Sequence, residues 1–364
     1  MTSVVEVNPA VKDAESKAPS VGKLVGYAAA GAIVGCAITI GVAYPTLKNK
    51  FEGESLPKNY CHKAKPTIGF DNAECVEVAL EQAGGNVTEG YEGGFNTSAT
   101  PITTTLAEAG LCPVNVHWHL GAEHLSVGQF DAAGSGPTYS GSARRLLAGD
   151  ELNTEPAIRC GHYDASNTIY TTEYEWKHCK DMKVGETYEV HWPHSAFGAC
   201  NTPFQYQTPF YDGVFCNLDG ATADAVGSAA DGDVALTSTA GQIGVQAQVF
   251  TIVNSDAAEY QYDNLIRGMI VDGTRGEHIQ AYTGSTTGTS RSNEICSRYA
   301  PITWHVDRKC HEISAKSFDK MCEQMKAQLD DMTGDLHPHG AREVVANSMT
   351  ANNGRDIDVY NDRQ

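Results

Sequence analysis

The chain is poor in basic residues. Its 364 residues include 26 lysines and arginines against 45 aspartates and glutamates, which gives a formal net charge of −19. Such a surplus of negative charge repels phosphate backbones, so nucleic acid is not an expected partner. Hydrophobic residues make up 41% of the chain, which is enough for a sizeable core.

The sequence also lacks any Cys-x-x-Cys pair, although it holds 11 cysteines. This absence disfavours a cysteine zinc site or a redox motif. Cys36 lies in a hydrophobic run, and the other ten cysteines are scattered over the chain. Scattered cysteines in even number, behind a membrane-targeting segment, suit disulfide bonds in an oxidising compartment. The sequence therefore predicts disulfides without fixing their pairing.

Charge is absent from residues 24–44, a run long enough to cross roughly 30 Å of hydrocarbon. We predict a transmembrane signal anchor there, preceded by a disordered cytoplasmic tail over residues 1–23. A cleaved signal peptide is the alternative, but its hydrophobic run is usually about 7–15 residues long. Gly31 and Gly35 in the run could let two helices approach, which would favour a homodimer; glycine is also simply frequent in membrane helices.

The anchor and the cysteines together place the remainder of the chain outside the cytoplasm. We expect a domain over residues 51–353 on the extracellular or periplasmic side or in an organelle lumen, followed by a tail over residues 354–364. Two glycosylation sequons begin at Asn86 and Asn96 in a Gly-rich stretch and are compatible with a glycoprotein in such a compartment.

Two histidines stand at alternate positions in a strand-like run from Cys112 to His124. Side chains alternate between the faces of a strand, so Asn115, His117 and His119 are expected to project to one side. The apolar residues between them are expected on the opposite side: Val114, Val116, Trp118 and Leu120. Two imidazoles on one strand face can supply two ligands of a metal site, and a third ligand must come from elsewhere in the chain.

A third histidine, His191, lies in another strand-like run, with Val190 and Trp192 on the opposite face. Three histidines and one open position are typical of a catalytic zinc site, whereas structural sites use four protein ligands and are often rich in cysteine. We therefore predict that His117, His119 and His191 bind zinc, with cobalt or cadmium as substitutes.

These motifs resemble a known family. His-x-His followed by Glu-His, with a later strand ending in His-Trp, resembles the active-site signature of alpha-type carbonic anhydrases. The runs CPVNVHWHLGAEH and YEVHWPHS are most similar to the delta carbonic anhydrases of marine microalgae. Residues 300–306, together with residues 313–317, also resemble the strand of alpha-type carbonic anhydrases that precedes the last core helix. The resemblance extends from about residue 61 to about residue 353.

The resemblance implies a mainly β fold with peripheral helices: one alpha-carbonic-anhydrase-like domain with a central, mostly antiparallel sheet. It also implies reversible, zinc-dependent hydration of carbon dioxide to bicarbonate and a proton, serving the acquisition of inorganic carbon. Zinc lowers the pKa of a bound water from 15.7 to about 7, which gives a hydroxide that attacks carbon dioxide at neutral pH.

In the family, a glutamate matching Glu123 accepts a hydrogen bond from a hydroxyl that orients this hydroxide. The hydroxyl is expected in the run 286–297, with Ser290 and Ser292 as candidates. His124 and His194 lie beside predicted site residues, where either could orient a ligand, replace His191 or carry protons.

Other histidines show no clear ligand spacing. We interpret His337-Pro-His339 as a surface loop.

Strands are expected at about 168–177, 186–192, 243–253, 265–271 and 301–307, and one helix from Ser314 to Met325.

Two other functions remain open from the residues. His-x-His-x-x-x-Glu also begins the metal motif of cupin-type oxygenases, in which the glutamate is itself a ligand. The second cupin motif needs Pro-x-Gly before its histidine, and residues 185–194 lack it. The other is a non-catalytic, membrane-anchored, cysteine-stapled binding protein. A relative that has lost its catalytic activity normally lacks a metal ligand or the glutamate. Here the three histidine ligands and Glu123 are all present.

Overall fold

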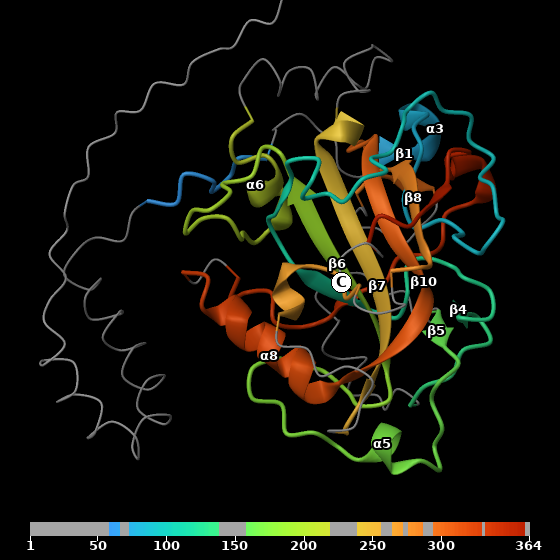
Figure 1. The fold of residues 1–364 in the computed structure, drawn as a ribbon, viewed down its shortest axis with the longest axis vertical. Helices are drawn as coiled ribbons and strands as arrows, with labels where there is room; N and C mark the ends of the chain where they lie inside the picture. The colour runs from blue at the N-terminus through green and yellow to red at the C-terminus, as the bar shows by residue number, and fades with distance from the viewer. Residues whose placement is uncertain are drawn as a thin grey trace, which may run out of the picture. The chain divides into compact units, whose positions relative to one another are not determined.

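The long strands of the protein lie side by side in one mixed sheet (Figure 1). Its order is β11-β3-β6-β7-β10-β8-β12, and β2 also pairs with β6. The strands have these bounds: β2 Cys112–Pro113, β3 His117–Leu120, β6 Thr187–Ser195, β7 Ile243–Val253, β8 Ile279–Gly284, β10 Ile302–Ser314, β11 His339–Gly340 and β12 Arg355–Ile357. The β7–β10 and β11–β3 pairs are parallel, and the other pairs of this sheet are antiparallel.

This computed structural model describes residues 58–65, 73–137, 158–218, 239–255, 264–271, 276–286, 294–329 and 332–360. A mainly β protein with a large sheet and few helices is confirmed. The expected anchor at 24–44, with Gly31 and Gly35, and the candidates Ser290 and Ser292 lie outside these residues. Within them, every helix is too short or too polar to cross a bilayer.

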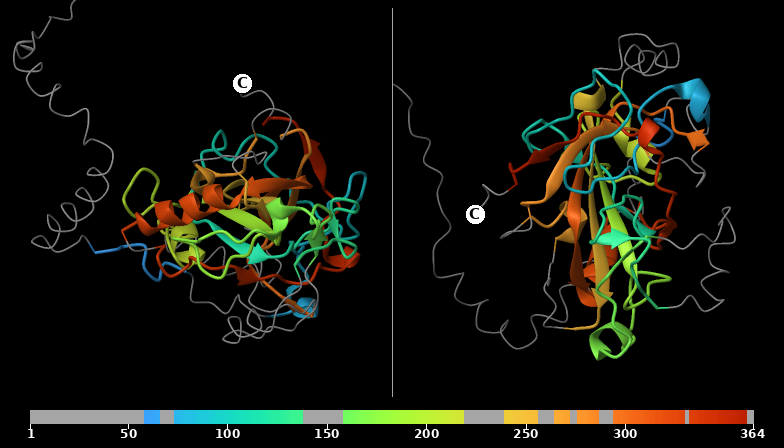
Figure 2. Two further views of the ribbon diagram at one scale, coloured as in Figure 1. Left: turned by 90° about the horizontal axis from the view of Figure 1, so that it is seen from below. Right: turned by 90° about the vertical axis from the view of Figure 1, so that its right-hand side faces the viewer.

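The central strands are buried on both faces. All eleven residues of β7 are buried, as its nearly continuous apolar sequence predicts for a strand covered on two sides. The sheet separates two apolar clusters, and Figure 2 shows it edge-on in the right-hand view. One cluster contains Trp118, Trp192 and Phe250, and the other contains Val245 and Trp304.

The helix α8 (Ala315–Lys326) covers one face of the sheet. Ser314 caps it, because its hydroxyl accepts a hydrogen bond from the amide of Ser317 at 3.1 Å. Phe318 and Met321 pack from the helix into the cluster of Trp118. The predicted helix is therefore confirmed.

Two predicted strands are wrong. Residues 168–171 form the helix α5 (Thr168–Thr171), because the side chain of Asn167 caps its first turn. Residues 265–267 form the 3-10 helix η4 (Leu265–Arg267). The chain after η4 does not join a strand: the side chain of Gln248 hydrogen-bonds both the amide and the carbonyl of Ile270, at 2.9 Å each.

The remaining elements are short and peripheral. They are β1 (Ala73–Glu74) with β9 (Ile295–Cys296), β4 (Phe130–Asp131) with β5 (Arg159–Cys160), and the helices α3 (Cys75–Val78), α6 (Phe210–Val214) and η5 (Asn347–Met349).

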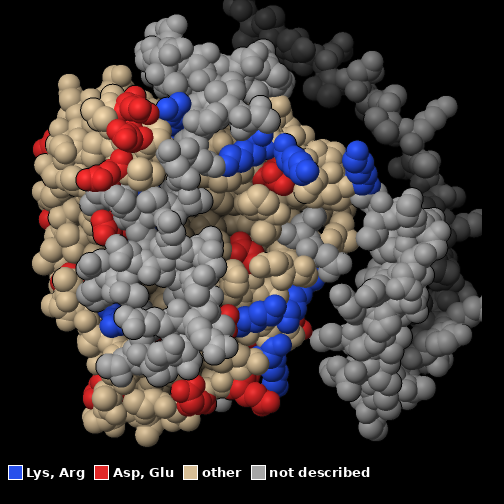
Figure 3. All heavy atoms as spheres, turned by 180° about the vertical axis from the view of Figure 1, so that it is seen from behind, with Lys and Arg blue, Asp and Glu red and all other residues tan. Residues whose placement is uncertain are grey.

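On the face shown in Figure 3, described acidic and basic side chains lie in several separate groups.

Disulfides join distant parts of this unit, as the cysteine count predicts. The described residues contain five: Cys61–Cys216, Cys75–Cys296, Cys112–Cys200, Cys160–Cys310 and Cys179–Cys322. They close loops of 88 to 221 residues. In the chain-entropy model, a loop of roughly 100 residues contributes about 4–5 kcal/mol to stability.

The folded unit extends past the boundary that the sequence predicted at residue 353. The strand β12 pairs with β8, and Tyr360 is buried. The hydroxyl of Tyr360 hydrogen-bonds His305 Nδ1 at 2.7 Å and accepts from Gln246 at 3.1 Å. Residues 355–360 therefore belong to the domain and not to a tail.

His194 and His305 generate a pH-dependent stability. Burial lowers the pKa of each to about 4, against about 6.5 in the unfolded chain. Between these values the unfolded chain binds protons that the folded chain does not. The free energy of unfolding should therefore fall as the pH falls from about 6.5 towards 4, by up to about 3 kcal/mol per histidine.

Urea denaturation of His194→Gln at pH 7.5 and 5 tests this. The variant should lose less stability than the native chain between these pH values. The exposed Val127 provides the control, since Val127→Ala removes no titrating group and should keep the native difference. An unchanged difference in His194→Gln would contradict the assignment.

Candidate metal centre

Three buried histidines converge between two neighbouring strands. The strand β3 carries His117 and His119, and β6 carries His191. The antiparallel register sets His117 directly opposite His191. The ring centroids lie 5.2 Å apart for His117 and His119, 5.4 Å for His117 and His191, and 4.8 Å for His119 and His191. The structure thus brings together the three predicted ligands.

The alternation of β3 holds over most of the expected run. Val116 and Trp118 pack in the cluster beneath α8, opposite the histidines, as predicted. Val114 departs from the prediction and packs in the other cluster. Strand β3 begins only at His117, so its alternation of side chains does not extend back to residue 114.

Each of these histidines has one ring nitrogen held by a protein oxygen. His117 Nδ1 lies 2.7 Å from Asn115 Oδ1, and His119 Nδ1 lies 3.1 Å from the carbonyl oxygen of Gly340. His191 Nε2 lies 3.1 Å from Glu189 Oε1. Such contacts fix the orientation of a ring and leave its other nitrogen for a metal.

His117 and His119 are held in the neutral form that binds metal. Burial lowers the pKa of His119 to about 4, although Glu123 opposes the shift. Burial, followed by the neighbouring histidines, lowers the pKa of His117 well below its usual value. Because metals bind neutral imidazole, no proton has to be removed from these rings at neutral pH.

Glu123 lies against His119, with Oε1 3.3 Å from His119 Nδ1. The same oxygen accepts a hydrogen bond from the amide of Arg342 at 2.7 Å. The other oxygen, Oε2, is buried and has no hydrogen-bond partner among the described residues, and the same is true of His119 Nε2. Buried polar atoms of this kind need a partner, so they fit a centre that holds a metal and its ligands.

The described residues of the run 286–297, which are 286 and 294–297, supply no hydrogen-bond partner for Glu123 Oε2. The hydroxyl of Thr286 lies 3.2 Å from that of Tyr211 and 3.0 Å from that of Ser297. The roles of Ser290 and Ser292, which lie outside the described residues, stay predictions.

Glu189 is a site residue that we did not predict. It contacts His191 and His124, and its Oε2 accepts from the backbone amides of Glu123 and His124. Burial alone would raise its pKa, but the charge and the hydrogen bond of His124, with that of His191, hold the pKa well below its usual value. The signal was present: a carboxylate two residues before His191 shares its strand face.

His124 lies behind the three ligands rather than among them. Its ring centroid is 6.3 Å from that of His191. Nδ1 lies 2.5 Å from Glu189 Oε1, and Nε2 lies 2.7 Å from the hydroxyl of Tyr282. His124 therefore supports Glu189.

His194 lies apart from this cluster. Its Nδ1 hydrogen-bonds the carbonyl oxygen of Trp192 at 2.7 Å, and it interacts with His305. Strand alternation sets His194 on the face of β6 opposite His191.

His339 is a fourth histidine at the centre, and its interpretation as part of a surface loop is wrong. It lies in β11 and pairs with His119 across the parallel ladder. Its ring stacks on His117 with centroids 5.2 Å apart, and it lies 5.4 Å from the ring of His119. The pairing joins residues 220 positions apart, which the sequence does not reveal. The only local signal is the His-x-His spacing of His337 and His339, which is the same as that of His117 and His119.

Three groups of side chains here have ligand atoms within 4.8 Å of one another, and each contains one or two of the three predicted ligands. They are His117, His119 and His339; His119, Glu123 and His191; and His124, Glu189 and His191. Apolar rings flank them: Phe210 stacks on His117 at 5.6 Å, and Trp304 lies 5.1 Å from His191. The surroundings therefore suit a small uncharged substrate beside a metal.

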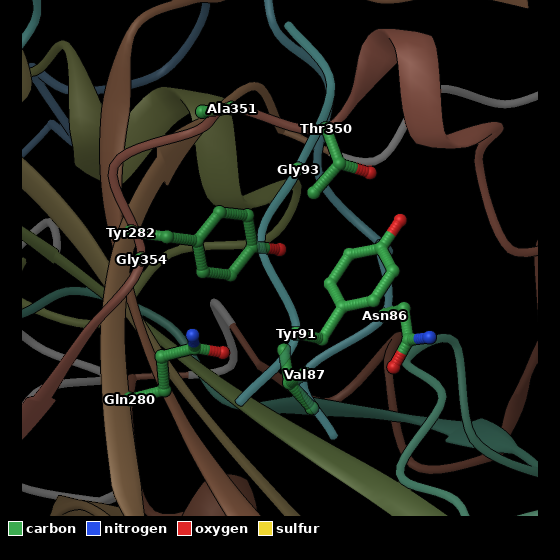
Figure 4. A pocket seen from close by; sticks show the side chains of 9 residues that line it. All are labelled: Asn86, Val87, Tyr91, Gly93, Gln280, Tyr282, Thr350, Ala351 and Gly354. Atoms are coloured by element: carbon green, nitrogen blue, oxygen red, sulfur yellow. The ribbon is translucent and has the colours of Figure 1, made fainter. Parts of the chain in front are cut away.

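A pocket close to Tyr282 is a separate feature. Figure 4 shows Tyr282 and Tyr91 pointing into it. Its volume of about 10 Å³ is room for about one water molecule, and no ligand histidine lines it.

Glu189 should be needed for tight metal binding. Glu189→Gln removes the negative charge that His191 and His124 contact, so the zinc affinity should fall by about 10- to 100-fold. Competition with a chromogenic chelator measures it. Glu186→Gln is the matched control: Glu186 is equally buried but pairs with Arg159 at 2.8 Å, and its loss should lower stability without this loss of affinity. Equal zinc affinity in both variants would contradict the assignment.

Comparison with known proteins agrees with this centre. A family model described as Delta carbonic anhydrase matches residues 108–317, more than half of the chain. The match includes His117, His119, Glu123 and His191. No curated protein and no solved structure matches the chain, so the alpha-carbonic-anhydrase-like fold stays a prediction. On the family match, the chain belongs to the delta carbonic anhydrases.

Proposed function

We propose that the protein catalyses the zinc-dependent, reversible hydration of carbon dioxide to bicarbonate and a proton. The observation that carries the proposal is the convergence of His117, His119 and His191 beside Glu123, whose Oε2 has no hydrogen-bond partner in the described part of the chain. Family membership supports carbonic anhydrase activity, and the donor set supports zinc.

His117, His119 and His191 would hold the metal, and cobalt or cadmium could replace zinc there. When bound, zinc supplies a nucleophilic hydroxide at neutral pH by lowering the pKa of a water. Asn115, Gly340 and Glu189 hold the three imidazoles in position through one nitrogen each.

Glu123 would orient the reacting groups. The amide of Arg342 holds Oε1, so Oε2 can accept a hydrogen bond from a hydroxyl of the run 286–297. Carbon dioxide is small and uncharged and needs an apolar surface beside the metal. Phe210 and Trp304 supply such a surface next to His117 and His191.

We propose a location outside the cytoplasm, with the catalytic domain anchored by residues 24–44 and serving the acquisition of inorganic carbon. The five disulfides support an oxidising compartment. Dimerisation through Gly31 and Gly35 remains part of the proposal.

Stopped-flow carbon dioxide hydration, together with metal analysis, tests the function. The native chain should hold zinc and be fast. His117→Ala should lose metal and activity together, because a ligand is missing. Glu123→Gln should keep the metal but be at least about 100-fold slower, because the amide nitrogen cannot accept the orienting hydrogen bond.

Other results would favour the alternatives. If Glu123→Gln also loses metal, and iron or manganese copurifies with the native chain, Glu123 is a ligand and a cupin-like oxygenase is favoured. A chain with neither metal nor hydration activity would instead be a binding protein.

A further inference from the structure

A second group of metal-ligand side chains lies in the segment that leads into β11. Asp335, His337 and His339 each offer one ligand atom, and these atoms lie within 4.8 Å of one another. Two imidazoles and a carboxylate form a donor set that zinc accepts in sites with three protein ligands and one open position. None of the predicted ligands in β3 or β6 belongs to this group.

The backbone around the group is held by packing. Asp335 is buried, and its amide donates to the carbonyl oxygen of Met332 at 3.2 Å. Leu336 is also buried, and its carbonyl oxygen accepts from the amide of Lys180 at 2.7 Å. Pro338 is buried between the two histidines. The segment is thus fixed on both sides of His337.

The side chains face one another and can be reached by an ion. Asp335 Oδ1 contacts His339 Nε2. The rings of His337 and His339 lie 5.9 Å apart, as the i, i+2 spacing of an extended segment allows. The side chain of His339 is 35% exposed, and His337 is exposed. Tetrahedral zinc, with bonds of about 2.0–2.1 Å, needs ligand atoms roughly 3.4 Å apart, an adjustment that rotation of His337 can supply.

This group shares one residue with the catalytic centre. His339 stacks on His117 and forms a ligand-competent group with His117 and His119. We propose that Asp335, His337 and His339 bind a second divalent transition-metal ion such as Zn²⁺, and that its binding alters the inner centre through His339.

Metal stoichiometry of the full-length chain in detergent tests the site. The metal-free chain should bind two zinc ions, one tight and one weaker, in isothermal titration. His337→Ala should keep the tight ion and bind the second at least about 10-fold more weakly. His117→Ala should lose the tight ion and keep the weaker one, which separates this site from the proposed function. His62→Ala, which removes an exposed histidine near Asp212, should bind both ions.

The coupling has a spectroscopic readout. With one Co²⁺ in the inner site, addition of one equivalent of Zn²⁺ should shift the visible absorption of the cobalt in the native chain, and metal analysis after desalting should show that the cobalt is retained. At the same zinc concentration the shift should be much smaller in His337→Ala, because this variant binds the outer ion more weakly while His339 stays in place.

Two results would overturn the outer metal site, and a third would overturn its coupling to the inner centre. The native chain could bind a single zinc ion at saturation, in which case no outer site exists. Alternatively, His337→Ala could bind the second ion as tightly as the native chain, in which case the ion lies elsewhere. A second ion that leaves the cobalt spectrum unchanged would overturn the coupling through His339.

Discussion

The antiparallel pairing of β3 with β6 is the constraint on which the centre depends. It sets His117 opposite His191 and leaves His119 one pleat away, so three imidazoles meet on one face of the sheet. On the opposite face of the same strands, Trp118 and Trp192 are completely buried. A shift of one residue in this register would exchange the two faces. The tryptophan core therefore fixes the position of the histidines.

Burial keeps His117 and His119 in their neutral form, and protein oxygens orient the rings of all three ligand histidines. Desolvation keeps His117 and His119 neutral, which lets them bind a metal without first losing a proton. Asn115, Gly340 and Glu189 then select which nitrogen points inward. The buried charge of Glu189 is itself compensated by His124 and two backbone amides. Glu189 thus orients His191, and His124 in turn holds Glu189.

The last part of the chain closes the centre from the side. The strand β11 adds to the edge of the sheet beside β3, and the next residues bring the amide of Arg342 to Glu123. This one segment thus supplies a carbonyl to His119, an amide to Glu123 and an additional imidazole, His339, against His117. Farther on, β12 and Tyr360 complete the sheet edge and the core contact with His305.

The sequence by itself determined the features that have a local period. Alternation in two short runs identified His117, His119, His191 and Asn115, a continuous apolar run identified β7, and a serine cap with an apolar stripe identified α8. Only the tertiary structure decided the long-range features: the disulfide partners, the place of His339, and the support of Glu189 by His124. The reason is physical. Alternation and capping act between neighbouring residues, whereas β11 meets β3 across 220 positions through backbone hydrogen bonds that every residue type except proline can donate. Local rules failed at 265–271 for the same reason, because the side chain of a distant glutamine, Gln248, replaced the neighbouring strand as the hydrogen-bond partner.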